Sequence, residues 1–384
     1  MKKLFFLPLV FFVLTSQAQT ISFIDNDWAR ARTEASSKNK YIFVDAYTDW
    51  CYWCKVMDKQ TFPDKEVVKF MSENFVPLKL EMEHNYGINV AMKYRVRSFP
   101  TFLVFSPDGH LVSKISGYME PPTFLGKLKE ALDPARKKDY AGVSADVDLA
   151  FPDFYKSVFG GKKNRPEAAV VNTYLDEQKD FFSEINYNVL VTFAGLLSEK
   201  HRSQLLDNRN KYEELYGKGD IDAAVYSVSD KLLRDAIKSK APEDLTTALN
   251  FSEKYQTEDK EDNKNYLLLK YYEGVQNWPL YGREVEAYIA KHPGEGNQIN
   301  GFSWTVYEKC DDADIINKAV GWMKPVVQRK QEYASTDTYA ALLYKAQNFK
   351  EAKVYAKKAI ELGKAAGEKT DETEKLLKKI EAAK

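Results

Sequence analysis

Apolar and polar positions in the first third of the chain follow strand patterns at four places. Residues 41–44 (Tyr-Ile-Phe-Val) form a continuous apolar run, which is typical of a buried central strand. Residues 75–82 predict a second strand. Residues 101–105 and 111–116 flank the turn at 106–109 (Ser-Pro-Asp-Gly), and this arrangement predicts a β-hairpin.

Helical spacing alternates with these strands. We expect helices over residues 27–37, 51–57, 64–73, 89–94 and 121–132, several of them opened by Asp or Pro. With residues 51–73 counted as one helical segment, the order of elements is then helix, strand, helix, strand, helix, two strands and helix. Such an order predicts an α/β domain with a mixed central sheet and helices on both faces.

Strand patterns stop after residue 132. Residues 133–139 (Asp-Pro-Ala-Arg-Lys-Lys-Asp) are polar and contain proline, so we predict a boundary between a domain over 19–135 and a second over 136–384. The second segment shows helical spacing and predicts an all-α, repeat-like domain. Its clearest breaks lie at 216–219, 292–294 and 345–348.

One stretch of this helical segment, residues 336–363, resembles a tetratricopeptide repeat. Ala340, Ala352 and Ala359 occupy the positions where that family places small residues. Thr336 stands where the family usually has Trp, and no proline closes the unit. An irregular helical bundle is the alternative.

The chain begins with a pattern typical of a signal peptide. Lys2 and Lys3 precede an apolar run over residues 4–14, and residues 16–18 (Ser-Gln-Ala) have the form of a signal-peptidase site. The run is too short for a spanning helix, which needs about 20 residues. We therefore expect residues 1–18 to be a signal peptide and the protein to be exported, to the periplasm or beyond the cell.

Charge and composition exclude some classes of partner and of scaffold. The 384 residues include 56 Lys and Arg and 56 Asp and Glu, so the formal net charge is zero. A balanced chain argues against nucleic acid as the main partner, because such binding needs a basic face. With three cysteines, the chain also cannot be a disulfide-stapled scaffold.

Cys51 and Cys54 are the strongest chemical signal. They directly follow a predicted strand and open a predicted helix, whose N-terminus stabilises a thiolate. We assign Cys51, with its sulfur exposed, as the nucleophile and Cys54, facing inward, as the resolving thiol. A structural disulfide and a zinc site are the alternatives, although zinc needs two more ligands and only His84 and His110 lie in this segment.

Two further residues fit the same chemistry. Asp45 lies in an apolar strand, where an unpaired carboxylate is costly, and it can accept the proton of Cys54. A backbone-bonded residue at a strand end is the alternative reading of Asp45. Pro100 precedes the strand at 101–105, and a cis bond there would turn the Phe99 backbone toward the sulfurs and toward an extended substrate. Trp50 and Trp53 flank the cysteines and predict an apolar rim for substrate.

These residues together resemble the thioredoxin superfamily. The resemblance rests on residues 44–58, which include Trp-Cys-Tyr-Trp-Cys-Lys-Val-Met-Asp, and on residues 93–101. It implies a thioredoxin fold, a redox-active Cys51–Cys54 pair, Asp45 as the buried acid and Pro100 as the substrate-loop proline. Lys79 matches the lysine that often accompanies that Asp. The sequence departs from the family in having Tyr52-Trp53 between the cysteines, which leaves the redox direction open.

The sequence thus predicts an exported thiol–disulfide oxidoreductase that reduces or isomerises protein disulfides. It needs no cofactor besides its own cysteine pair and no metal, and an upstream thiol protein supplies its electrons. We expect the helical segment to dock a protein partner or a second copy. The alternative is a non-catalytic periplasmic scaffold that binds proteins through its helices.

Overall fold

The computed structural model describes residues 20–134, 140–160, 164–256 and 258–383. The predicted signal peptide and residues 135–139 of the predicted boundary lie outside this part. The chain divides into two compact units, one ending at Ala224 and one covering Val225–Lys384. Among the described residues, no helix combines the length and the apolar character that crossing a membrane requires.

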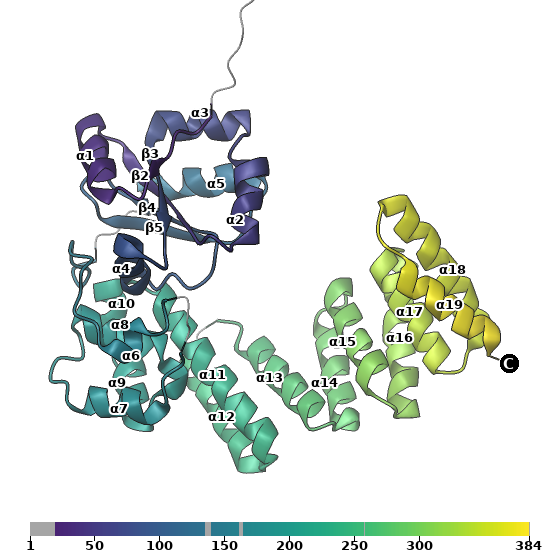
Figure 1. Cartoon of the computed structure of the whole chain (residues 1–384). Helices are drawn as coiled ribbons and strands as arrows, with labels where there is room; N and C mark the ends of the chain where they lie inside the picture. The colour runs from purple at the N-terminus through teal and green to yellow at the C-terminus, as the bar shows by residue number, and fades with distance from the viewer. Residues whose placement is uncertain (1–19, 135–139, 161–163, 257, 384) are drawn as a thin grey trace, which may run out of the picture. The chain divides into compact units, whose positions relative to one another are not determined.

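A five-stranded mixed sheet forms the centre of the first unit (Figure 1). Its strand order is β1-β3-β2-β4-β5, in which β1 and β2 run parallel to β3, while β4 runs antiparallel to β2 and β5. The strands are β1 (Ile24–Asp25), β2 (Tyr41–Tyr47), β3 (Phe75–Glu81), β4 (Thr101–Phe105) and β5 (Leu111–Ser116). The four predicted strands are confirmed. The sequence missed β1, because two residues are too few to show a period.

Helices cover both faces of this sheet, as predicted. On one face, an apolar cluster joins Phe43 and Phe102 of the sheet to Phe124 and Leu128. The helices on this side are α2 (Tyr52–Val56) with the π-helix η1 (Met57–Thr61), α3 (Lys65–Asn74) and α5 (Pro121–Ala131). On the other face, Trp28 and Tyr94 pack edge-on against Phe105. They belong to α1 (Trp28–Lys38) and α4 (Asn85–Tyr94).

Helix α4 begins four residues earlier than the predicted start at residue 89, and Gly87 lies in its first turn. A Cβ at position 87 would lie 1.8 Å from the backbone oxygen of Glu81, so only glycine allows this close approach. The sequence pattern gave no sign of that contact, because it joins the helix to the end of β3.

The first unit continues beyond the sheet into further helices, some of which contact α4. The Tyr155 hydroxyl donates to the backbone oxygen of Met92 at 2.8 Å, and the fully buried Lys93 ammonium lies 2.6 Å from the Glu184 carboxylate. These helices are α6 (Asp153–Lys156), α7 (Ala168–Asp176), α8 (Glu184–Thr192), α9 (Glu199–Leu206), α10 (Arg209–Tyr216) and α11 (Gly219–Ser239). Contacts therefore divide the chain at residue 224, inside α11, whereas the predicted boundary follows the sequence pattern.

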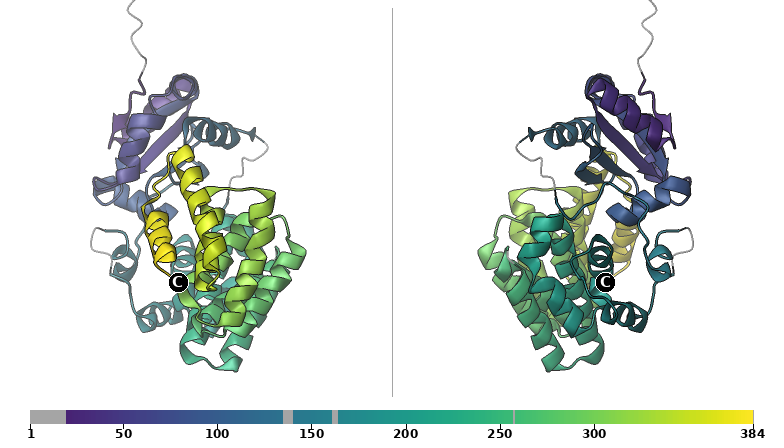
Figure 2. Two further views of the ribbon diagram at one scale, coloured as in Figure 1. Left: turned by 90° about the vertical axis from the view of Figure 1, so that its right-hand side faces the viewer. Right: turned by 90° about the vertical axis from the view of Figure 1, so that its left-hand side faces the viewer.

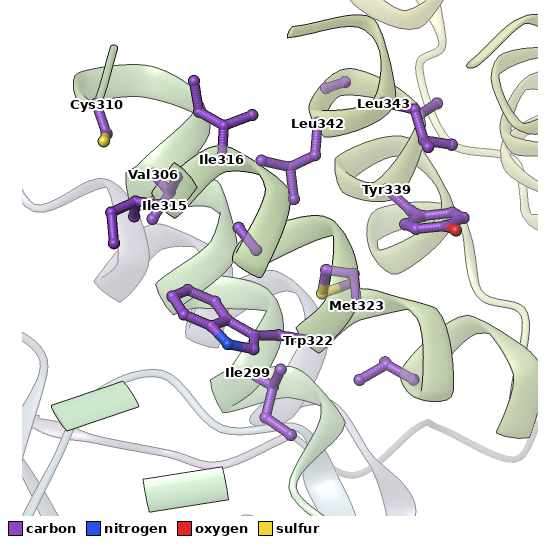
Figure 3. Close-up of a cluster of buried hydrophobic side chains, with 14 of the residues drawn as sticks. Ile299, Val306, Cys310, Ile315, Ile316, Trp322, Met323, Tyr339, Leu342 and Leu343 are labelled. Carbon is purple, nitrogen blue, oxygen red and sulfur yellow. The ribbon is translucent and has the colours of Figure 1, made fainter. Parts of the chain in front are cut away.

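The second unit is entirely helical in its described residues. Neighbouring helices from α16 to α19 lie side by side (Figures 1 and 2). Trp322, Met323 and Leu342 are part of their shared apolar core, as is the buried free thiol of Cys310 (Figure 3). The helices are α12 (Pro242–Tyr255), α13 (Lys260–Gly274), α14 (Trp278–Lys291), α15 (Gly296–Lys309), α16 (Ala313–Arg329), α17 (Tyr333–Lys345), α18 (Phe349–Ala366) and α19 (Asp371–Ala382). The three predicted breaks all fall between helices.

Candidate functional site

The two cysteines lie where the central strand β2 gives way to α2. Cys51 is the N-cap of α2, and its Sγ accepts the backbone N–H of Cys54 at 3.0 Å. The backbone N–H of Cys51 donates to Thr48 at 3.0 Å, which fixes the loop between strand and helix. Cys51 and Cys54 form a disulfide with an S–S distance of 2.12 Å. The sequence therefore places a redox-capable pair at a helix start.

The expectation of an exposed Cys51 sulfur is wrong for this oxidised state. Cys51 is only 3% exposed and Cys54 is 5% exposed. The sulfur of Cys51 is bonded to Cys54 and turned toward the Cys54 N–H, so it does not face solvent. A partner thiol must therefore approach a largely covered disulfide.

Asp45 lies in β2 and is 2% exposed. Its neighbour across the parallel strand pair is Lys79, whose Nζ lies 3.7 Å from Asp45 Oδ2. The other carboxylate oxygen, Oδ1, has no hydrogen-bond partner among the described residues. Burial raises the pKa of Asp45 to about 7, with Lys79 opposing this shift and the negative charge of Asp58 adding to it. The carboxyl group can therefore exchange a proton near neutral pH.

Lys79 has a second carboxylate partner that the sequence analysis did not single out. Its Nζ also contacts Asp58 Oδ1, and Asp58 lies in η1, four residues after Cys54. Lys79 is therefore shared between two carboxylates, so its single positive charge does not fully neutralise Asp45. The only sequence signal was that Asp58 ends the quoted cysteine motif.

The segment before β4 brings Phe99 and Pro100 to the same end of the sheet. The peptide bond between them is cis, and the backbone oxygen of Pro100 accepts the N–H of Gly117 at 2.9 Å. Pro100 is buried and Phe99 is half-buried. Phe99 meets the ring of Trp50 edge-on, with 5.9 Å between centroids, so the structure joins this segment to the residue before Cys51.

Aromatic side chains surround the disulfide on the surface. Trp50, Tyr52 and Trp53 are 60%, 69% and 50% exposed. The Trp50 indole donates to Glu83 Oε2 at 3.0 Å, and Trp53 packs on Tyr118 with 5.1 Å between ring centroids. The sequence had named only the two tryptophans. Large exposed aromatic side chains gathered at one place are typical of a binding surface.

Across the part of the chain that the structure describes, no group of three His, Cys, Asp or Glu side chains is placed to hold an ion. At β2 and α2 the structure combines a disulfide at a helix start with a buried carboxyl group in the preceding strand.

Known proteins are similar to this chain over the same region. Residues 28–132 match the family model of a thioredoxin-like domain. The thiol:disulfide interchange protein DsbD of Pseudoalteromonas atlantica (strain T6c / ATCC BAA-1087) is 32% identical over 111 residues, which are 28% of this chain and 19% of that protein. DsbD of Escherichia coli (strain K12) is 33% identical over 98 residues, which are 24% of this chain and 17% of that protein. The chain thus spans about a fifth of the length of these curated relatives.

Two solved structures are also similar to part of this chain. A candidate disulphide isomerase from Bacteroides thetaiotaomicron is 33% identical, with 31% of this chain and 98% of that chain covered and a TM-score of 0.29. A thioredoxin from Thermus thermophilus is 22% identical, with 29% and 88% covered and a TM-score of 0.28. The family match, the strand order and the Cys51–Cys54 spacing agree: residues 28–132 form a thioredoxin-like domain, followed by a large all-helical region.

Proposed function

We propose that this protein is a thiol–disulfide oxidoreductase that reduces or isomerises disulfides in other proteins. One observation carries the proposal: the Cys51–Cys54 disulfide caps a helix directly after the strand that holds the buried Asp45. The curated relatives, which are named thiol:disulfide interchange proteins, support the same chemistry.

The reduced form would act in two steps. The Cys51 thiolate attacks one sulfur of a substrate disulfide, forms a mixed disulfide and releases the first substrate thiolate. The Cys54 thiol then loses its proton and attacks Cys51 Sγ, which releases the second substrate thiolate. Two electrons have passed to the substrate, and Cys51–Cys54 is again a disulfide. A thiol protein acting upstream restores the dithiol.

In the second step Asp45 accepts the proton of Cys54. A carboxyl group with a pKa of about 7 is partly ionised at neutral pH and can both take and return a proton. The Lys79 ammonium, 3.7 Å from Asp45, lowers the free-energy cost of the buried carboxylate without keeping Asp45 permanently ionised. Asp45 is therefore a catalytic residue in this proposal.

The aromatic surface would receive the substrate. Trp50 and Trp53 offer exposed apolar area on either side of Cys51, while Phe99 would present its backbone at the cis bond that joins it to Pro100. An extended protein segment can pair with such backbone and lay apolar side chains on the indoles. The redox pair needs no cofactor besides itself.

We further propose that residues 1–18 direct export to the periplasm or out of the cell, where disulfides persist. Residues 19–135 would be the redox domain and residues 136–384 the helical domain. The family match that ends at residue 132 supports this division. The helical domain, with its tetratricopeptide-like stretch at 336–363, would bind a protein partner or a second copy.

Insulin reduction driven by dithiothreitol tests the proposed activity. Cys51→Ser should reduce the rate to the uncatalysed background, whereas Cys310→Ala, which changes a buried thiol far along the chain, should keep it. Equal rates for wild type and Cys51→Ser would instead favour a non-catalytic scaffold. Trapping with Cys54→Ser should then hold substrates on Cys51 and identify them.

A further inference from the structure

The first unit contains a cavity that the redox chemistry does not use. It has a volume of about 490 Å³ and is bounded by β5 and the end of α4 on one side and by α8 and the start of α11 on the other. Protein interiors rarely leave voids much larger than a water molecule. The volume falls in the range of small-molecule sites, roughly 300–1,000 Å³.

Four cations line this cavity, together with two carboxylates. One of the four, Lys218, pairs at 3.9 Å with Asp222, which is not part of the lining. Lys93 is paired with Glu184 at 2.6 Å. Arg95 and Lys114 share the other carboxylate, Asp220: Arg95 is in direct contact with it, and the Lys114 ammonium lies 3.6 Å away. The Arg95–Lys114 side of the cavity therefore carries an excess positive charge.

Arg95 also has an unused donor. Its Nη atoms contact the Lys93 backbone oxygen, Asn188 and Asp220. Its buried Nε has no acceptor in the described part of the chain. This atom has almost no accessible surface, so the guanidinium acts on the cavity through its charge and not through this donor. Burial lowers the pKa of Lys114, while Asp220 opposes that shift.

The remaining wall is largely apolar. Leu111, Val112, Val143 and Ala223 line it together with the ring of Tyr94. A cavity with a cationic end and an apolar body matches a ligand of the same two-part character. A fully polar ion such as inorganic phosphate would leave the apolar wall without a partner.

We propose that this cavity binds a small organic anion, with its carboxylate, sulfonate or phosphate group at Arg95 and Lys114 and its apolar body along Val112 and Val143. Charge complementarity with Arg95 and Lys114, which share the single carboxylate of Asp220, places the anionic group, and the cavity volume limits the size of the body. The site is independent of the proposed redox activity, since it includes neither cysteine nor Asp45.

Fluorescence titration of the full chain with 8-anilinonaphthalene-1-sulfonate tests this proposal, with the uncharged N-phenyl-1-naphthylamine as the matched probe. We expect one sulfonate bound per chain. Lys114→Gln should weaken sulfonate binding at least fivefold and change binding of the uncharged probe less than twofold. Lys200→Gln, an exposed lysine of α9 that pairs with Asp176 at 2.6 Å and does not line the cavity, is the matched control and should leave both unchanged.

A second variant checks the location. Ala223 lines the cavity but is exposed, so Ala223→Trp should fold and occupy part of the volume. It should remove the stoichiometric binding of both probes. Sulfonate binding that is equal in wild type, Lys114→Gln and a folded Ala223→Trp would overturn the proposal. Cys51→Ser should bind the sulfonate as wild type does, so a failure here is distinct from a failure of the redox proposal.

Discussion

Two buried ion pairs that involve the thioredoxin-like domain differ in how completely their charged atoms are paired. At the redox end of the sheet, Lys79 Nζ lies 3.7 Å from Asp45, is shared with Asp58, and leaves Asp45 Oδ1 without a partner among the described residues. On α4, the Lys93 ammonium lies 2.6 Å from Glu184. Both pairs join a buried charge to a residue distant in sequence, yet only one is tight.

The tight pair is completed by a third residue. The Ser144 hydroxyl accepts from the Lys93 ammonium at 3.0 Å and donates to Glu184 Oε2 at 2.7 Å. The Ser144 backbone N–H donates to the same carboxylate at 3.0 Å. Such a network holds α4, α8 and the intervening chain in one arrangement. The loose pair leaves Asp45 free to change its protonation state. We infer from this difference that the Lys93–Glu184 pair serves the structure, whereas Asp45 is free to serve the proposed proton transfer.

Breaking the tight pair between Lys93 and Glu184 should have the largest effect on stability. Lys93→Met should destabilise the protein by about 3–5 kcal/mol, because Glu184 is left buried without its cation. Denaturant unfolding followed by circular dichroism measures this change. The double variant Lys93→Met, Glu184→Leu should recover more than half of the loss. A single variant within about 1 kcal/mol of wild type would show that the pair is not structural.

Breaking the loose pair between Asp45 and Lys79 should raise the stability of the protein instead of lowering it. The folded pKa of Asp45, about 7, lies above its ordinary value of 3.8, so its contribution to stability is fully present below pH 3.8 and is lost as the pH rises through 7. Asp45→Asn removes this loss and should stabilise the protein by roughly 2–4 kcal/mol at pH 8, with almost no gain at pH 4. Unfolding free energies at pH 4, 6 and 8 give the comparison. A loss of stability at pH 8 would contradict it.

The pKa of the reduced Cys51 thiol should also lie below its ordinary value. At a helix N-cap, with the Cys54 N–H directed at its sulfur, its pKa should be about 7 or lower. The pH dependence of iodoacetamide alkylation measures it, in a Cys310→Ala background so that one other thiol is removed. Burial raises the pKa of Cys310, which makes it the contrasting thiol in the same chain. A single transition near 8.5 would refute the shift.

The smallest expected effect concerns the aromatic surface. Trp53→Ala should raise the KM for a disulfide-containing protein by about threefold to tenfold, because a stacked aromatic contact of roughly 1 kcal/mol is lost. A small generic disulfide should react as before. Tyr226→Ala, at a similarly exposed aromatic position outside the site, is the control. Equal effects of the two variants would remove Trp53 from the substrate surface.

Much of the site could be predicted because its signals are local. Cys51 and Cys54 stand three residues apart after an apolar strand, and Asp45 is a charged residue within that strand. The structure extends β2 to Tyr47 and so places Asp45 in the strand interior. A local sequence pattern is sufficient to predict a site whose residues are close together in the sequence.

The remainder depends on contacts between distant residues, which one sequence does not reveal. Lys93 and Glu184 are 91 positions apart, and Arg95 and Asp220 are 125 apart. Neither pair has a motif, so the helical wall on α4 and its cavity were not predicted. The covering of Cys51 was missed for a related reason, since it depends on the disulfide geometry and not on helix position.

The most direct test of the account follows the two phases of thiolate release when the reduced protein reacts with 5,5′-dithiobis(2-nitrobenzoate). The first phase reports attack by Cys51, and the second reports attack by Cys54 on the mixed disulfide. If Asp45 takes the Cys54 proton, the second phase should rise with pH around 7, and Asp45→Asn should slow it about a hundredfold. The first phase should stay within about twofold of wild type, since general-base assistance acts only on Cys54. A second phase with the same rate and pH dependence in Asp45→Asn would contradict the account.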